Sequence, residues 1–281
     1  MKNINRTSWL IILLICGLSL PSLSGLLVFP FSIIIPESLE TTYEISLVLI
    51  FLVLTLFTYK KDELKKNWKL FFAFFVASFS ITIDLFINYG SNTVTGIASD
   101  MILSASLIVG FIIILTKAAG ENLQSLFLQR GNTKLGLLIG ISGFIFFAAT
   151  STLTATFLFQ GQNLTLNRII AWTPWIIVTV MANGLREELL YRGLFLRKYE
   201  MVLGSRLSNF LQATIFSLSH SVAGRGTEIY TPYTAIFVLF TLVLGLIWGY
   251  IMQKTNSVIG SILFHAGSDI PIFIGIFSNL P

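Results

Sequence analysis

Charged residues are scarce in this chain of 281 residues. Asp, Glu, Lys and Arg together make up 11% of it, against about 25% in soluble globular domains. So little polar surface cannot cover a water-soluble fold, which excludes a soluble enzyme and a disordered tail. Cys16 is the only cysteine, so the chain has no internal disulfide and is not a disulfide-stapled secreted domain.

Apolar residues take the place of charge. Hydrophobic residues make up 54% of the chain, Phe occurs 25 times, and the mean hydropathy is +0.83. A membrane-spanning helix needs about 20 mostly apolar residues. The sequence therefore predicts an all-α, polytopic integral membrane bundle with eight or nine transmembrane helices in a lipid bilayer. Nine candidate segments run near 8–35, 41–59, 69–89, 97–116, 135–159, 169–198, 206–222, 232–252 and 257–279.

Two of these segments are long for a single crossing. Pro21 and Pro30 interrupt the first, which predicts a kink or a break there, because proline removes a backbone donor. Gly193 is expected to break the sixth. Glycines four residues apart, at Gly136–Gly140 and Gly245–Gly249, predict sites where helices approach closely.

The basic residues indicate an orientation in the membrane. Five lysines lie between Lys60 and Lys69, in the loop after the second segment, and the positive-inside rule assigns such a loop to the cytoplasm. Alternation along the chain then predicts a cytoplasmic N-terminus and an outer C-terminus, in the cell membrane. The net charge of +5 is scattered over loops rather than gathered on one face, so no nucleic-acid partner is expected.

Ionisable residues inside the predicted spans are the most informative, because they cost free energy there and usually face a cavity or a partner. The run Arg186–Arg192 holds two adjacent carboxylates. Glu188 and Arg192 are four residues apart, so they share a helix face and can pair. Glu187 is rotated by about 100° from its neighbour and can point into a site. The alternative is that this run is the cytoplasmic end of a helix, where its charges face solvent. Asp84, near the outer end of its segment, is interpreted as structural.

The two histidines of the chain also lie in predicted spans, in its last third. His220 closes the run Phe216–His220, and His265 lies four residues before Asp269, on the same helix face. Taken alone, each of these two motifs is consistent with a polar side chain that is hydrogen-bonded in the core of the bundle. The helical rise puts these residues and Glu187 about 14 to 21 Å from the cytoplasmic helix ends. This similar depth predicts one shared site.

Two histidines and several carboxylates support two kinds of hydrolytic site. In the first, a divalent metal ion, zinc by first choice, binds three nitrogen or oxygen ligands and a water molecule. In the second, which needs no metal, Glu187 and His220 activate water and His265 helps to hold the oxyanion. An ionised Asp269 cannot donate a hydrogen bond, so it suits a metal ligand or a partner that orients a histidine. The candidate metal ligands are Glu187, His220, His265 and Asp269.

The order and spacing of these residues resemble the CPBP family of intramembrane proteases, which covers CAAX proteases and bacteriocin-processing enzymes and is also called the Abi family. Its pattern is E-E-x-x-x-R, F-x-x-x-H and H-x-x-x-N/D on consecutive helices. Here the three motifs are Glu187–Arg192, Phe216–His220 and His265–Asp269. The resemblance implies a catalytic four-helix membrane core over residues 166–281. Residues 1–165 then form an N-terminal region of about five helices with no assigned role.

The resemblance also implies roles for the motif residues. Glu187 is expected to be the principal catalytic carboxylate, and the histidines to be catalytic or metal-binding. Eukaryotic prenyl-protein peptidases of the family have Asn where this chain has Asp269, which counts against inferring CAAX-protein substrates from the resemblance alone. The expected catalytic set is Glu187, Glu188, His220, His265 and Asp269, with structural support from Arg192 and Phe216.

The function predicted from these residues is that of an intramembrane (metallo)endopeptidase, which acts on a membrane-embedded or lipidated peptide. Three alternatives stay open. A transporter or proton relay uses similar residues, although we find no inverted repeat. A non-catalytic protein of the bacteriocin-immunity type keeps the fold without the reaction. A serine protease would use Gly140–Gly143, which fits the G-x-S-G of rhomboids but leaves the paired glutamates idle.

Overall fold

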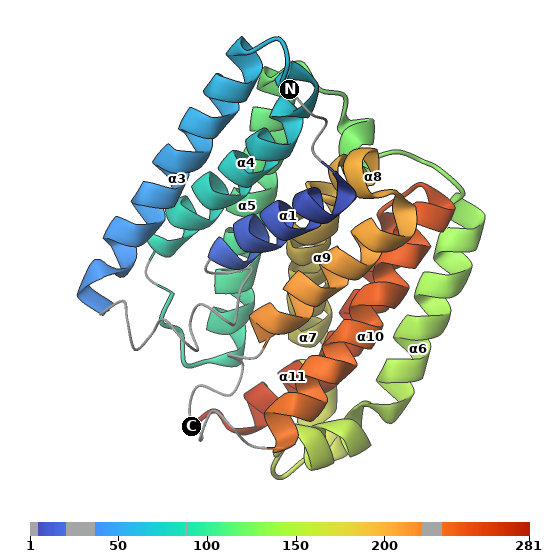
Figure 1. Ribbon diagram of the computed structural model, residues 1–281. Helices are drawn as coiled ribbons and strands as arrows, with labels where there is room; N and C mark the ends of the chain where they lie inside the picture. The colour runs from blue at the N-terminus through green and yellow to red at the C-terminus, as the bar shows by residue number, and fades with distance from the viewer. Residues whose placement is uncertain (1–4, 21–36, 88, 221–231) are drawn as a thin grey trace.

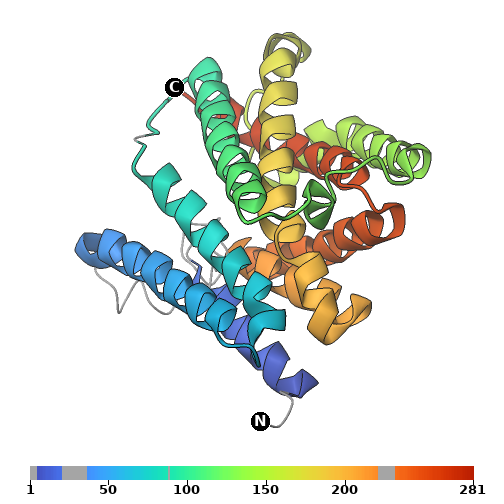
Figure 2. The ribbon, with the colours of Figure 1, turned by 90° about the horizontal axis from the view of Figure 1, so that it is seen from above.

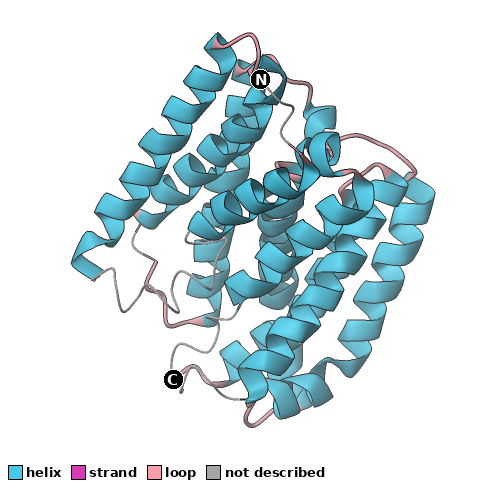
Figure 3. Ribbon diagram, in the orientation of Figure 1, coloured by secondary structure: helices cyan, strands magenta, loops and turns pink. Residues whose placement is uncertain are grey.

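The protein is built from helices, as the sequence predicts. The computed structural model describes residues 5–20, 37–87, 89–220 and 232–281, and these contain no strand (Figure 3). The α-helices are α1 (Arg6–Ser19), α3 (Glu37–Lys60), α4 (Trp68–Leu85), α5 (Val94–Ala118), α6 (Thr133–Leu158), α7 (Leu166–Glu187), α8 (Leu196–Leu203), α9 (Ser205–Ser219), α10 (Pro232–Thr255) and α11 (Ile259–Ser278) (Figure 1). The short turns are η2 (Lys65–Asn67), η3 (Leu123–Leu126) and η4 (Glu188–Gly193).

Seven helical stretches among the described residues are long and apolar enough to cross a membrane. They coincide with seven of the nine predicted segments. The other two segments, near 8–35 and 206–222, contain the shorter helices α1 and α9, of 14 and 15 residues. The kink predicted at Pro21 and Pro30 lies outside the described residues, and the orientation of the bundle in the membrane stays a prediction.

The sixth predicted segment is one long helical stretch with a change of winding in it. The α-helix α7 ends at Glu187 and passes into the π-helical turn η4, and α8 follows. The backbone N–H of Leu194 donates to the carbonyl of Leu189, five residues earlier, which is π-helical spacing. The break expected at Gly193 therefore falls at the end of a π turn. Such turns inside α-helices are frequent at functional sites.

Helix α7 lies in the middle of the bundle, with α5 on one side and α11 on another (Figure 2). Helix α11 packs in turn along α6, α9 packs along α10, and α3 pairs with α4 at one edge of the bundle (Figure 1). Helices of the predicted N-terminal region, α5 and α6, therefore contact helices of the predicted core directly.

Glycines allow the closest of these contacts. A Cβ atom at Gly184 of α7 would lie 3.1 Å from the carbonyl oxygen of Ile262 in α11. One at Gly140 of α6 would lie 2.9 Å from the carbonyl oxygen of Gly260. The close packing predicted for Gly136–Gly140 is thus confirmed, and the approach at Gly184 brings the two helices together beside the polar residues described next.

Candidate active site

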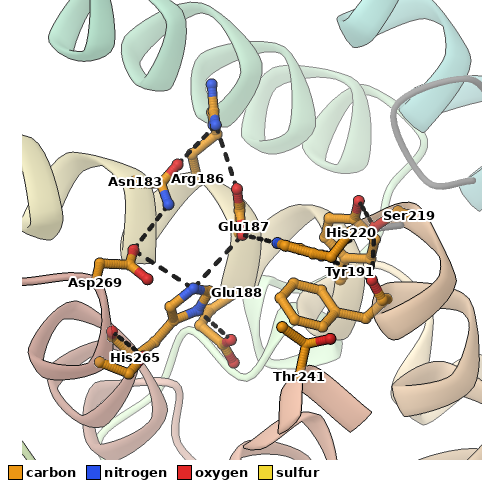
Figure 4. A network of polar contacts seen from close by, with 12 residues as sticks. Asn183, Arg186, Glu187, Glu188, Tyr191, Ser219, His220, Thr241, His265 and Asp269 are labelled. Atoms are coloured by element: carbon orange, nitrogen blue, oxygen red, sulfur yellow. Dashed lines mark hydrogen bonds and ion pairs between the residues drawn. The ribbon is translucent and has the colours of Figure 1, made fainter. Parts of the chain in front are cut away.

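Four ionisable side chains from three helices meet beside the π turn (Figure 4). Glu187 ends α7, His220 follows α9, and His265 and Asp269 lie one turn apart on α11. Nε2 of His265 is 3.5 Å from Oε2 of Glu187 and 3.6 Å from Oδ2 of Asp269. Nε2 of His220 is 4.0 Å from the same Oε2 of Glu187. The three sequence motifs therefore come together at one carboxylate oxygen.

The two oxygens of Glu187 have different surroundings. Oε1 accepts a hydrogen bond from Nη2 of Arg186 at 3.3 Å. Oε2 is buried, and no donor among the described residues forms a hydrogen bond with it. A carboxylate oxygen with two lone pairs and no donor has spare capacity to accept a proton or a hydrogen bond. This oxygen is the one that faces both histidines.

Both histidine rings are held through Nδ1. Nδ1 of His265 is 2.8 Å from Oε1 of Glu188, and Nδ1 of His220 is 2.8 Å from the carbonyl oxygen of Phe216. A carbonyl oxygen and an ionised carboxylate can only accept, so in each ring Nδ1 is the donor. Both rings therefore carry a hydrogen on Nδ1 and turn Nε2 toward Glu187.

A buried ion pair lies next to His265. Nη1 of Arg192 donates to Oε1 of Glu188 at 2.5 Å, and neither side chain has any exposed surface. This confirms the predicted pairing and excludes, for these two residues, a helix end with solvated charges. The guanidinium lies 4.5 Å from the ring centroid of Phe216 and 4.9 Å from that of Trp248. A Cβ atom at Gly245 would lie 3.2 Å from Nη2, so this glycine makes room for the arginine.

Two residues at the site were missed in the sequence. The indole of Trp248 stacks on the ring of His265, and Nδ2 of Asn183 donates to Oδ2 of Asp269 at 2.8 Å. Trp248 belongs to no motif, and a tryptophan in an apolar span gives no signal of its own. Asn183 did carry one, because it is a polar residue in a span, one helical turn before Glu187.

The donor atoms can be compared with those of a metal site. Among the residues that the structure describes, no group of three or more His, Cys, Asp or Glu side chains is arranged to hold a metal ion. Oδ2 of Asp269 is already hydrogen-bonded to Asn183. The side chains as arranged therefore do not fit a resident metal ion, and the metal ion stays a prediction.

The serine of the rhomboid-like pattern lies apart from this site. Ser142 is exposed on α6. In the described part of the chain, neither histidine ring has a polar contact with Ser142. The polar partners of the two rings are Phe216, Ser219, Glu187, Glu188 and Asp269. The geometry therefore gives Ser142 no base, which a serine nucleophile needs.

Comparison with known families identifies the part of the chain that carries the site. Residues 169–270, about a third of the chain, match the model of the Rce1-like family, described as type II CAAX prenyl endopeptidase Rce1-like. This segment forms an Rce1-like core. No curated protein and no solved structure matches the chain in such comparisons.

The Rce1-like core contains every motif residue from Glu187 to Asp269. The match confirms the resemblance to the CPBP family of intramembrane proteases. It supports an intramembrane endopeptidase over a transporter, which this family model does not describe. Together with the seven long apolar helices of the described residues, it indicates a multi-pass membrane protein in which residues 169–270 are similar to that family.

Proposed function

We propose that this protein is a membrane-embedded endopeptidase in which Glu187 activates the water molecule that hydrolyses a peptide bond. One observation carries the proposal. Oε2 of Glu187, which has no hydrogen-bond donor among the described residues, lies within 4.0 Å of Nε2 of both His220 and His265. A candidate base and two imidazoles thus surround one point, on helices packed in an apolar bundle.

The gap between Glu187 and His220 suits a shared water molecule. Their atoms are 4.0 Å apart, which is too far for a direct hydrogen bond. A water molecule at about 2.8 Å from each would bridge them. Nε2 of His220 has a free lone pair when the neutral ring carries its hydrogen on Nδ1, so it orients the water, and Glu187 takes the proton as the water attacks.

His265 suits the stabilisation of the oxyanion. Its Nδ1 donates to Glu188. When Nε2 is protonated as well, the ring is a cation between the carboxylates of Glu187 and Asp269. The Nε2–H then donates to the oxygen that gains negative charge as the water adds to the carbonyl carbon. Asp269 itself cannot donate when ionised, so its role is to orient this ring.

The proton balance closes with Glu187 as the acid. The water oxygen forms a bond to the carbonyl carbon, and its proton moves to Oε2 of Glu187. The carbon–nitrogen bond then breaks, and the same proton passes to the leaving nitrogen. The products are a carboxylic acid and an amine, and the acid then releases the second proton of the water molecule to solvent. No covalent intermediate with the enzyme is formed.

The proposed substrate is a lipidated or membrane-embedded peptide. The matching family is described as a CAAX prenyl endopeptidase, which names prenylated sequences as what its members act on. The proposed site lies between helices of a bundle that exposes many large apolar side chains, so a lipid anchor would bring a peptide to it. Opening of the site toward the cytoplasm follows from the predicted orientation.

The test uses the full-length protein in lipid vesicles with a quenched fluorescent peptide that ends in a farnesylated CAAX sequence. Mass spectrometry identifies the products. We expect cleavage by the wild type, none by Glu187→Gln, and normal cleavage by Glu63→Gln, which changes an exposed glutamate. Cleavage by Glu187→Gln at the normal rate contradicts the proposal. Proton flux that depends on His220, without any peptide product, supports a transporter instead.

A further inference from the structure

A line of hydrogen bonds runs from the C-terminal end of α4 to Glu187. The hydroxyl of Tyr89 donates to Oδ1 of Asp84 at 2.6 Å, and Oγ of Ser104 donates to Oδ2 of the same carboxylate at 2.8 Å. Nη1 of Arg186 donates to Oγ of Ser104 at 3.0 Å. Nη2 of Arg186 donates to Oε1 of Glu187 at 3.3 Å. These four hydrogen bonds form a continuous connection from Tyr89 to Glu187.

The same guanidinium is also connected to Asp269, the second carboxylate beside His265. Nη2 of Arg186 donates to Oδ1 of Asn183 at 2.6 Å, and Nδ2 of Asn183 donates to Oδ2 of Asp269 at 2.8 Å (Figure 4). Arg186 thus reaches Glu187 directly and Asp269 through one amide.

The line is largely shielded from solvent. Ser104 and Asn183 are buried, and the side chains of Arg186 and Glu187 are 22% and 15% exposed. Hydrogen bonds to charged groups are stronger in such surroundings than in water, and a lost partner costs more. Ser104 is therefore placed to influence the guanidinium and not only to fill space.

The hydrogen bond from Nη1 to Ser104 fixes the direction of the guanidinium, and this direction decides which oxygen of Glu187 stays open. A guanidinium with two free edges binds both oxygens of a carboxylate in a fork. Here Nη1 is bonded to Ser104, and Arg186 contacts Glu187 only at Oε1. Oε2 is left for water. If the hydroxyl were absent, the guanidinium would lose the contact that fixes its direction and would be free to turn and bind both oxygens of Glu187, including the one that has to act as the base.

We propose that Ser104 and Asp84 are positioning residues for Glu187, acting through Arg186. Both belong to the helices before the Rce1-like core, Asp84 to α4 and Ser104 to α5. The N-terminal helices thus complete the active site of the core. The inference rests on the proposed role of Glu187 as the base.

The test compares Ser104→Ala with Ser104→Thr in the vesicle assay. Ser104→Ala removes the hydroxyl and is expected to lower kcat about tenfold or more, as for one charge-assisted hydrogen bond, with KM little changed. Ser104→Thr keeps a hydroxyl and is expected to restore most of kcat. Ser106→Ala is the matched control, because its exposed hydroxyl on the same helix bonds only to the backbone of Ile102.

A double variant separates positioning from general damage. Arg186→Gln removes the group through which Ser104 acts, so Ser104→Ala should cause no further loss of kcat in that background. An equal loss in both backgrounds overturns the inference, and so does a normal kcat for Ser104→Ala or an equal loss for Ser106→Ala. If Glu187→Gln is inactive while Ser104→Ala is normal, only this inference fails. If Glu187→Gln cleaves normally, the proposed function fails with it.

Discussion

The indole ring of Trp248 lies parallel to the imidazole ring of His265, with the ring centroids 4.0 Å apart and an interplanar angle of 7°. The same indole contacts the guanidinium of Arg192. One buried aromatic side chain of α10 thus covers the ring that we propose as the oxyanion donor and the buried cation beside it. Trp248 is 2% exposed, so this contact belongs to the interior of the bundle.

Replacing Trp248 should affect both stability and catalysis. Trp248→Ala opens a cavity and should lower the free energy of unfolding by about 3–5 kcal/mol. It should also lower kcat, because the ring of His265 loses the surface that fixes its plane. Trp248→Phe keeps an aromatic face and should retain more of both. Unfolding in mixed micelles and the vesicle assay measure the two effects, with Tyr250→Ala, at an exposed position of the same helix, as the control. An unchanged kcat for Trp248→Ala would refute this role.

The buried pair of Glu188 and Arg192 should be more sensitive to single than to double replacement. Arg192→Met leaves the carboxylate buried without its cation and should cost about 3–5 kcal/mol of stability. Glu188→Gln together with Arg192→Met removes both charges and should recover part of that loss. The free energies of unfolding of the two single variants and the double variant test this. If the losses of the two single variants add up in the double variant, the two charges do not stabilise each other.

A second ion cluster makes a prediction about pH. Oε1 of Glu121 is 2.6 Å from Nζ of Lys69, and its Oε2 is 3.6 Å from Nζ of Lys198. Burial opposes the charge of Glu121, but the hydrogen bond from Lys69 and the charge of Lys198 outweigh it and hold the pKa of Glu121 below its ordinary value of 4.5. The ionised carboxylate therefore stabilises the fold above that ordinary value, and the contribution is lost as the pH falls through the lowered pKa.

Glu121→Gln should accordingly be less stable than the wild type at neutral pH, by about 3 kcal/mol for a buried ion pair. The difference should shrink in acid as the wild-type carboxylate becomes protonated. Thermal or denaturant unfolding of both proteins as a function of pH measures this. Glu63→Gln is the control, since Glu63 is exposed. A stability difference that is constant down to acid pH would show that the charge of Glu121 does not matter.

Removal of metal ions tests the alternative of a metal-dependent protease, which the histidines and carboxylates suggested in the sequence. Because the water in our proposal is held by Glu187 and His220, cleavage should survive a zinc chelator, and purified protein should contain no stoichiometric metal. Metal analysis of the wild type and of His220→Ala measures this directly. One equivalent of zinc in the wild type, lost in His220→Ala together with activity, would favour the metalloprotease instead.

The sequence predicted the parts of this molecule that follow from local spacing. Apolar runs of about 20 residues predicted the long helices because a helix satisfies its backbone hydrogen bonds within one segment in lipid. The four-residue interval predicted the Glu188–Arg192 pair, and the cost of burying His220 and His265 suggested that they share a site. These inferences need the helix period and hydropathy, and nothing of the arrangement of helices.

What could not be predicted depends on which helices become neighbours. Ser104 and Arg186 meet because α5 packs on α7, and Trp248 reaches His265 because α10 packs on α11. No spacing in the sequence encodes such contacts. Asp84 was interpreted as a structural residue near the outer end of its segment, and its hydrogen bond with Ser104, which connects it to the site, was not predicted. The π turn after Glu187 was also missed, since composition does not distinguish its winding from that of an α-helix.

The most direct test of the account is the rate of peptide-bond hydrolysis by Glu187→Gln, measured beside the wild type with the farnesylated peptide in vesicles. The amide keeps the size of the side chain and the hydrogen-bond acceptor for Arg186 but cannot take a proton from water. We predict a loss of about 100-fold to 10,000-fold in kcat, as expected for removal of a general base. A Glu187→Gln protein that is folded and hydrolyses the peptide at the wild-type rate would contradict the account.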